Sequence, residues 1–410
     1  MTKIGFVGLG KLGLPCALAM EHYGGHTVVG YDINPEVANY ISSGSIPYRE
    51  EGVEELLKET KIRILDTVFD VVQESDIVFV PIQTPHDPRF EGVTKLTEER
   101  ADFDYTFLRK GVEQIALACL WQKKPTTVVI ISTVLPGTTE REIKPLLNKY
   151  VRLCYNPYFI AMGTTIADFI DPEFVLLGHE DSETAQQIKT LYQTIHDQPV
   201  FETNIATAEL IKVAYNTFIG MKIVFINTMM EICHRTDADV DELTDALSLA
   251  TTRLLSPKYL RGGMGDGGGC HPRDNIAMSW LASKLNLSHN IFDDLMKARE
   301  DQTNWLARMV GFGDEVFFLG KAYKPETNLT VGSPALLLQE MVYWAKMWDP
   351  YIDPPSAEPH DVGVYIITTN HAQFAHKRFA PGSTVIDPWG YIPDQSGVNV
   401  IRLGRKKPLS

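Results

Sequence analysis

The sequence predicts an α/β protein in which a doubly wound parallel sheet comes first, one long helix follows, and a smaller α/β domain ends the chain. Short Val- and Ile-rich runs alternate with helical stretches over the first half. A helical pattern then extends from Ile205 to about Arg235, interrupted only by Gly220. The strand-rich pattern returns after about Asp314. We therefore expect three domains, at 1–203, 204–300 and 301–410.

The candidate strands lack polar alternation, as expected where helices cover both faces of a parallel sheet. In the first half they are KIGFVG (3–8), TVVGYDI (27–33), SDIVFVPI (75–82), TTVVIIST (126–133), YVRLCYNP (150–157) and FVLLG (174–178). The C-terminal part supplies strands in EVFFLG (315–320), DVGVYIITT (361–369) and STVIDPW (383–389), with a helix over SPALLLQEMVYWAKM (333–347).

Length and composition exclude several classes of protein. The 410 residues, of which 44% are hydrophobic and 22% charged, are typical of a globular chain with more than one core. With 38 Lys and Arg against 52 Asp and Glu, the net charge of -14 repels nucleic acid, so we expect no nucleic-acid partner. A local cluster of basic groups and helix N-termini still allows an anionic small molecule to bind.

Targeting and cysteine signals are also informative. No apolar run reaches 18 residues and none resembles a signal peptide, so we expect a soluble, cytoplasmic protein without a membrane partner. The 5 cysteines are widely spaced and form no CxxC pair, which indicates neither a disulfide framework nor a metal site.

A dinucleotide-binding fingerprint opens the chain. Gly8, Gly10 and Gly13 form G-x-G-x-x-G directly after the first strand and at the start of a helix. In this motif the glycines provide a tight turn, a close backbone approach to pyrophosphate, and close packing of helix and strand. Asp32 ends the second strand, where a carboxylate accepts hydrogen bonds from ribose hydroxyls and repels a 2′-phosphate. The pattern predicts a Rossmann-type domain and NAD rather than NADP; a glycine-rich turn beside a surface Asp is the alternative.

Cys270 is a candidate nucleophile. It follows three glycines and precedes a helix start marked by Pro272 and Asp274, so a loop without side chains exposes the thiol and the helix N-terminus lowers its pKa. The alternative is a small buried side chain, the common fate of a cysteine.

Polar residues elsewhere are weaker signals when taken singly. Glu209, Lys212 and Asn216 fall on one face of the long helix, an arrangement that fits either a catalytic stripe or a solvated face. Thr84-Pro85 and the segment from Ser132 to Gly137 follow strands, and strand ends in such sheets form the ligand crevice.

Seven motifs in this order resemble the UDP-glucose/GDP-mannose dehydrogenase family over nearly the whole chain. They are GLGKLGLP, QTP (83–85), STVLPGTT, NPYF, AELIKVAYNTF, SPKYLRGGMGDGGGCHPRD and GKAYKPETN. The resemblance implies an NAD-dependent nucleotide-sugar 6-dehydrogenase of polysaccharide biosynthesis. Such an enzyme oxidises a hexose C6 alcohol to the acid with two NAD, through a thiohemiacetal and a thioester on cysteine.

The resemblance also implies roles for individual residues. Cys270 matches the nucleophile, Lys212 and Asn216 the groups that stabilise an alkoxide, Asp274 a carboxylate that positions water or lysine, and Thr133 the strand-end hydroxyl. The expected cofactor contacts are Gly8, Gly10, Leu12, Gly13, Asp32, Thr84, Pro85 and Thr133. The expected contacts to the nucleotide-sugar substrate are Tyr158, Phe159, Lys212, Asn216, Tyr259, Arg261, Gly267 and Lys324. The middle helix resembles a dimerisation spine, so we expect a homodimer, and the C-terminal domain resembles a nucleotide-binding domain.

Some positions depart from the family pattern. Tyr158 and Met162 stand where the family has acidic residues, the first of which is associated with activating water for thioester hydrolysis. Val331 and Gly332 replace an Arg-Glu pair, Lys321 is unusual, and Arg273 replaces a common Lys.

These departures leave alternatives open. The chain acts on a different sugar nucleotide, or releases the aldehyde after one oxidation, or uses another base, for which Tyr158 is a candidate. A hypothesis of a different functional class is a non-catalytic protein that binds sugar nucleotides, but Cys270 and the glycine fingerprint argue against it. A two-electron β-hydroxyacid dehydrogenase would share the N-terminal architecture without needing the GGGC loop.

Overall fold

The computed structural model describes residues 2–48, 50–85, 101–236, 238–256, 262–264 and 270–405. The chain divides into two compact units, Met1–Gly220 and Met221–Ser410, and each is described by itself. Within the described residues, no helix is long and apolar enough to cross a membrane.

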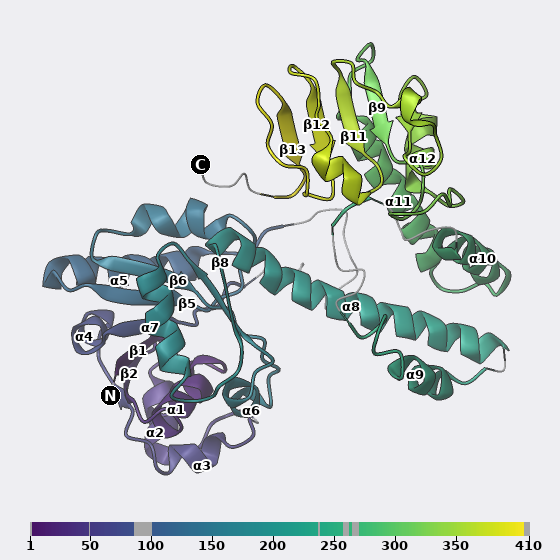
Figure 1. Ribbon diagram of the computed structural model, residues 1–410. Coiled ribbons are helices and arrows are strands. Elements are labelled where there is room, and N and C mark those ends of the chain that lie inside the picture. Colours follow the sequence, from purple (N-terminus) through teal and green to yellow (C-terminus); the bar gives the residue numbers. More distant parts are fainter. Residues whose placement is uncertain are drawn as a thin grey trace. The chain divides into compact units, whose positions relative to one another are not determined.

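Two sheets organise the chain (Figure 1). The first has the order β3-β2-β1-β4-β5-β6-β7-β8 and the second the order β10-β9-β11-β12-β13. The described strands of the first sheet are β1 (Lys3–Val7), β2 (Thr27–Tyr31), β3 (Arg63–Ile64), β4 (Ile77–Val80), β5 (Thr126–Ile130), β6 (Val151–Tyr155), β7 (Val175–His179) and β8 (Val200–Thr203). Those of the second are β9 (Val316–Leu319), β10 (Lys346–Trp348), β11 (Val364–Ile367), β12 (Thr384–Asp387) and β13 (Asn399–Arg402).

Helices connect these strands. They are α1 (Gly13–His22), α2 (Glu36–Ser43), α3 (Val53–Leu57), α4 (Val68–Glu74), α5 (Thr106–Gln122), α6 (Thr165–Ile170), α7 (Ser182–Tyr192), α8 (Ile205–Thr236), α9 (Val240–Ser248), α10 (Cys270–Lys284), α11 (Ile291–Ala307) and α12 (Pro334–Met341). The short π or 3-10 helices are η2 (Thr139–Ile143), η3 (Lys144–Leu146), η4 (Pro355–Ala357) and η5 (Ala372–His376).

The first sheet is buried on both faces, which explains its continuous apolar strands. Side chains from α1, α6 and α7 form the core on one face, and side chains from α4, α5 and the first turns of α8 form the core on the other. Its strands pair in parallel except for β6 and β7, which pair antiparallel through Cys154 and His179. The predicted Rossmann-type α/β fold is confirmed.

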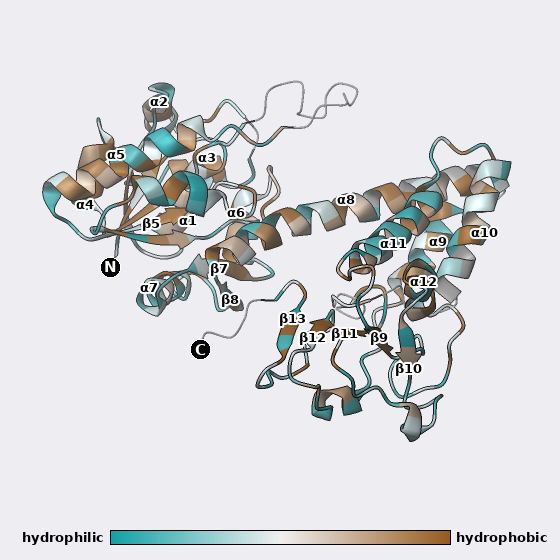
Figure 2. Cartoon of the chain, turned by 90° about the horizontal axis from the view of Figure 1, so that it is seen from above, coloured by the Kyte–Doolittle hydropathy of each residue, from teal (hydrophilic) through white to brown (hydrophobic). Residues whose placement is uncertain are grey.

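The second sheet is parallel throughout and also covered on both faces. Leu306 of α11 and Leu338 of α12 pack on one face with Phe318, while Phe374 and Phe379 pack on the other with Tyr365. Figure 2 shows the hydrophobic character of its central strands. This is the smaller C-terminal α/β fold expected from the sequence.

The sequence misplaced one segment of this unit. The helix expected over residues 333–347 ends at Met341, and Lys346–Trp348 instead forms β10, paired with β9. The backbone leaves the helical region at Val342, where φ is -120° and ψ is 62°. Val342, Tyr343 and Trp344 have lower helix propensity than the Leu and Met residues before them, and they form the bend and turn between α12 and β10.

Candidate active site at the carboxyl edge of the first sheet

Five strands bring the predicted residues of the first unit to one edge of the sheet. β2, β1, β4, β5 and β6 are parallel neighbours, so their carboxyl ends all lie at this edge. Asp32, Thr84, Thr133 and Tyr158 each follow one of these strands, as does Gly8. Ligands of open α/β sheets bind outside such ends.

The structure constrains the three glycines of the fingerprint in different ways. Gly8 has a φ of +108°, and a Cβ added at Gly13 would lie 2.2 Å from the Gly8 carbonyl oxygen. The fold itself therefore requires glycine at these two positions. A Cβ added at Gly10 would meet nothing within 4 Å among the described atoms. The described chain therefore does not itself require glycine at Gly10, and the space beside it is open to a ligand.

The N-terminus of α1 is open to an anion. Leu12 precedes the helix, no side chain caps it, and its first turn contains no acidic residue. In this first turn Pro15 has no N–H, and the Leu14 and Cys16 N–H groups donate to the Gly10 and Leu12 carbonyl oxygens at 3.1 and 3.3 Å. The attraction for an anion therefore comes mainly from the helix dipole, which places a partial positive charge at this end. Together with the space above Gly10, this cradle fits the pyrophosphate of a dinucleotide.

Asp32 links the glycine loop to the end of β2. Its Oδ2 accepts a hydrogen bond from the Leu9 N–H at 2.5 Å, and its Oδ1 accepts one from the Asn34 N–H at 2.8 Å. The carboxylate therefore has a fixed position beside the loop, where it can accept from ribose hydroxyls and repel a 2′-phosphate.

The loops after β4 and β5 are tied together. The Thr84 hydroxyl donates to the Thr133 carbonyl oxygen at 2.7 Å, and the Ser132 hydroxyl donates to the Ile82 carbonyl oxygen. The Pro85 carbonyl oxygen accepts from the Asp104 N–H at 2.8 Å. Thr84, Pro85 and Thr133, three expected cofactor contacts, thus belong to one hydrogen-bonded edge.

Lys212 is a buried cation at this edge. It is 8% exposed, and its Nζ donates to the Tyr158 carbonyl oxygen at 2.7 Å and lies 5.0 Å from the Phe159 ring centroid. The Phe159 ring packs between Phe174 and Tyr215. Burial lowers the pKa of the Lys212 amine, and no described carboxylate offsets this effect.

The polar stripe on α8 is divided between buried and exposed residues. Glu209 is fully buried, and its two oxygens accept from the Gly137 N–H at 2.5 Å and the Thr139 N–H at 2.8 Å. Asn216, one turn beyond Lys212, is exposed. The interpretation of this stripe as a solvated face therefore holds for Asn216 and is wrong for Glu209 and Lys212.

The Tyr158 side chain turns away from Lys212 into the core on the α1 side of the sheet. Its hydroxyl lies 3.1 Å from that of Tyr192, and its ring packs 5.4 Å from that of Phe169. Burial first, and then neighbouring Tyr192, raise the pKa of the Tyr158 phenol well above its usual range. This phenol stays protonated at neutral pH, so the structure gives no support to Tyr158 as an alternative base.

The predicted nucleophile belongs to the second unit. Cys270 is the first residue of α10 and Asp274 lies one helical turn further on. The side chains of both residues lie outside the described residues, as do Tyr259, Arg261 and Gly267 entirely. The helix that the sequence placed just after Cys270 is present and begins at Cys270 itself.

The second sheet also has a topological switch point, the position where open α/β sheets bind ligands. β9 pairs with β10 on one side and β11 on the other, so the loops after β9 and β11 separate at a topological switch point. Lys324 lies exposed in the loop after β9, with its Nζ 5.6 Å from the Tyr323 ring centroid.

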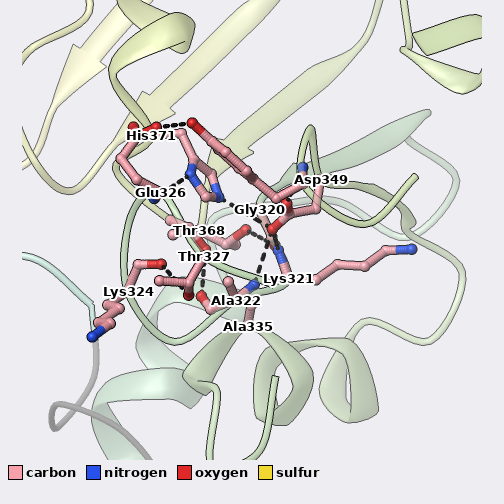
Figure 3. Close-up of polar contacts among 12 residues, drawn as sticks. Gly320, Lys321, Ala322, Lys324, Glu326, Thr327, Ala335, Asp349, Thr368 and His371 are labelled. Carbon is pink, nitrogen blue, oxygen red and sulfur yellow. Dashed lines mark hydrogen bonds and ion pairs between the residues drawn. The ribbon is translucent and has the colours of Figure 1, made fainter. Parts of the chain in front are cut away.

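A buried His–Asp pair holds this loop (Figure 3). Asp349, fully buried, accepts through Oδ2 from the N–H groups of Lys321 and Ala322 at 2.7 and 3.0 Å and from His371 Nε2 at 3.2 Å. His371 Nδ1 accepts from the Glu326 N–H at 3.0 Å, so its proton resides on Nε2. These hydrogen bonds hold the pKa of Asp349 below its ordinary value despite burial.

Lys321, one of the unusual residues, also has a partner. Its Nζ lies 2.7 Å from Asp353 Oδ1, and both side chains are mostly buried. Sequence reasoning missed Asp349 and His371, because the segment before Asp349 was expected to be helix and is the strand β10. No cluster of metal-ligating residues occurs in the described part of the chain.

Comparisons with known proteins agree with this geometry. Residues 2–196 match the NAD-binding domain model of the UDP-glucose/GDP-mannose dehydrogenase family, and residues 206–300 match the family's central domain model. The UDP-glucose 6-dehydrogenase TuaD of Bacillus subtilis is 27% identical over 87% of this chain and 78% of its own length. The GDP-mannose 6-dehydrogenase of Pseudomonas aeruginosa is 28% identical over 83% of this chain and 78% of its own length.

Solved structures share the fold. A crystal structure of a ternary complex of GDP-mannose dehydrogenase from Pseudomonas aeruginosa has a TM-score of 0.86 at 23% identity, covering 97% of this chain and 99% of the other. The UDP-D-ManNAc dehydrogenase of Pyrococcus horikoshii has a TM-score of 0.52 at 25% identity, covering 98% and 99%.

The glycine geometry predicts opposite effects of two matched substitutions. Gly13→Ala forces a methyl group against a backbone oxygen and should lower the free energy of unfolding by about 3 kcal/mol or more. Gly10→Ala should leave the melting temperature unchanged but weaken NAD binding at least about tenfold, because the methyl group occupies the approach to the backbone. Thermal unfolding and calorimetric titration with NAD measure both. Wild-type NAD affinity in Gly10→Ala would contradict the assigned cradle.

Proposed function

Because this chain belongs to the UDP-glucose/GDP-mannose dehydrogenase family, we propose that it oxidises the C6 hydroxyl of a nucleotide-activated hexose to the uronic acid. The substrate class is UDP-glucose, a UDP-N-acetylhexosamine or GDP-mannose, and the product would serve polysaccharide biosynthesis. The observation that carries the proposal is the buried Lys212 amine at the same sheet edge as the dinucleotide cradle.

Cofactor binding rests on residues of the first unit. Gly8, Gly10, Leu12 and Gly13 would receive the pyrophosphate, and Asp32 the adenosine ribose. Thr84, Pro85 and Thr133 would line the same edge toward the nicotinamide. NAD, when bound there, accepts one hydride in each of two oxidations.

Lys212 and Asn216 would stabilise charge at the reacting oxygen. Lys212 contributes a cation held by the Tyr158 carbonyl oxygen, in a setting where little water weakens its field. Asn216, one turn later and exposed, adds an amide donor to the same helix face. Transfer of the C6 hydroxyl proton to a solvent water would leave an oxyanion opposite these two groups.

Cys270 would carry the second half of the reaction. Its thiol adds to the C6 aldehyde as a thiohemiacetal, whose oxidation gives a thioester, and water cleaves the thioester to the acid and the free thiol. Since the Tyr158 phenol is not a base at neutral pH, we assign activation of this water to Asp274. Tyr158, through its carbonyl, and Phe159 hold Lys212, while Tyr259, Arg261, Gly267 and Lys324 would contact the sugar nucleotide.

Counting NADH tests this proposal. UDP-glucose, UDP-galactose, UDP-N-acetylhexosamines and GDP-mannose are each supplied in limiting amount with excess NAD, and absorbance at the NADH band is followed to completion. We expect two NADH per sugar for one substrate class, with the uronic acid identified by mass spectrometry. One NADH with free aldehyde would contradict the complete reaction, and no NADH with any sugar would contradict the enzyme class.

Cysteine variants sharpen this experiment. Cys270→Ala should form no acid, because no thioester forms, while Cys119→Ala, a matched change in α5, should keep two NADH per sugar. Acid formation by Cys270→Ala at the wild-type rate would exclude Cys270 as the nucleophile.

We also propose that the chain forms a homodimer through α8. Large apolar side chains on this helix remain exposed, including Phe218 at 42%, Met221 at 54%, Val224 at 49% and Phe225 at 41%. Their spacing of three and four residues gathers them on one helix face, and Figure 2 shows hydrophobic residues along α8. A contiguous apolar stripe of this kind is typical of a protein interface.

Sedimentation velocity at micromolar concentration tests this interface. The wild-type chain should sediment at twice the 46.0 kDa monomer mass. Phe225→Glu should shift it toward monomer, because it buries a charge in the apolar stripe, whereas Phe225→Leu should remain dimeric. A stable wild-type monomer would contradict the proposal.

A further inference from the structure

The loop between β5 and η2, residues 131–138, is hydrogen-bonded to the segment after β4, to α8 and, through the Tyr105 hydroxyl, to the start of α5. At its start, the Thr84–Thr133 and Ser132–Ile82 hydrogen bonds tie it to the segment after β4. At its end, only Glu209 ties it to α8 by hydrogen bonds among the described residues. Thr133 lies in the loop after β5 and Lys212 lies on α8. Glu209 joins this loop to this helix at the sheet edge.

The Glu209 contact is stronger than an ordinary surface interaction. The carboxylate is fully buried, and each oxygen accepts one backbone N–H more than 60 residues away in the sequence. Charge-assisted hydrogen bonds in a water-poor site are short and directional. The contact fixes Gly137, whose φ of +86° makes a tight turn, against the first turns of α8.

Lys212 is anchored one helical turn further along α8. Its Nζ contacts the Tyr158 carbonyl oxygen, in the loop after the next strand, β6. Helix α8 is thus bound to the β5 loop by Glu209 and to the β6 loop by Lys212. A shift of the first contact changes the position of the helix, and with it the position of the Lys212 ammonium relative to Thr133.

We propose that Glu209 is a positioning residue, which sets Lys212 and the loop carrying Thr133 at the separation that hydride transfer from the substrate C6 requires. This inference rests on the proposed function. Glu209 contacts neither ligand; it acts by fixing the Lys212 ammonium relative to the loop that carries Thr133. Small errors in such placement are costly, since about 1 Å of displacement can reduce a rate about 100-fold.

Glu209→Gln tests the proposal while keeping the size of the side chain. Its amide has one acceptor oxygen, so one backbone N–H keeps its bond and the other faces an NH₂ donor. We expect kcat per active site to fall about 10- to 100-fold. The Kd for NAD, measured without sugar, should change much less than kcat, because the Gly8, Gly10 and Asp32 contacts are untouched and only the Thr133 contact moves.

A double-mutant cycle separates positioning from loss of structure. If Glu209 acts through Lys212, Glu209→Gln should reduce kcat less than about threefold when Lys212 is already Ala. Asp181→Ala, which removes the cap at the start of α7, serves as the control: it should lower the melting temperature but leave kcat unchanged.

The outcomes are distinct. Wild-type kcat in Glu209→Gln, or an equal loss with and without Lys212, overturns the positioning role even when the melting temperature falls. An inactive wild-type enzyme instead overturns the proposed function on which the inference rests.

Discussion

Helix α8 is held against the carboxyl edge of the first sheet by two buried charged side chains one turn apart. The Glu209 carboxylate accepts hydrogen bonds from two backbone N–H groups that follow β5, those of Gly137 and Thr139. The Lys212 ammonium donates a hydrogen bond to the Tyr158 carbonyl oxygen in the loop after β6. Neither contact is an ion pair. Among the described residues, peptide dipoles face both charges, and the Phe159 ring also faces Lys212, so each charge holds a loop in place without an ion pair.

This arrangement has an energetic cost. Removing an ammonium from water costs several kcal/mol in a protein interior, and one carbonyl and one aromatic ring compensate only part of it. The remainder appears as the lowered pKa of Lys212. A developing oxyanion would compensate the rest, so the site stabilises the charged reacting species more than the neutral substrate. At position 158 the backbone, and not the side chain, contacts Lys212, so this contact does not depend on which side chain stands there.

The sequence predicted the features that depend on local pattern. The strands ending near Gly8, Asp32 and Thr133, the long helix and the glycine fingerprint all follow from hydrophobic periodicity and turn chemistry, and the structure confirms them. β10 could not be separated from the preceding helix because its apolar residues fit either period. The burial of Glu209 and the inward turn of Tyr158 depend on contacts more than 30 residues away, which local pattern does not contain. The role of Cys270 follows from its motif and stays a prediction.

The pKa of Lys212 is the most direct measure of this account. Competitive labelling of lysine amines, read by mass spectrometry across a pH series, gives the titration midpoint of each lysine in the intact protein. We expect a Lys212 midpoint below the ordinary lysine value of about 10.4, and turnover that falls as the pH rises through this midpoint, because the cation is lost there. Lys346, whose pKa Glu315 raises, should titrate at the opposite extreme. A Lys212 midpoint at or above the ordinary value would contradict the claim that α8 holds an uncompensated cation at the site.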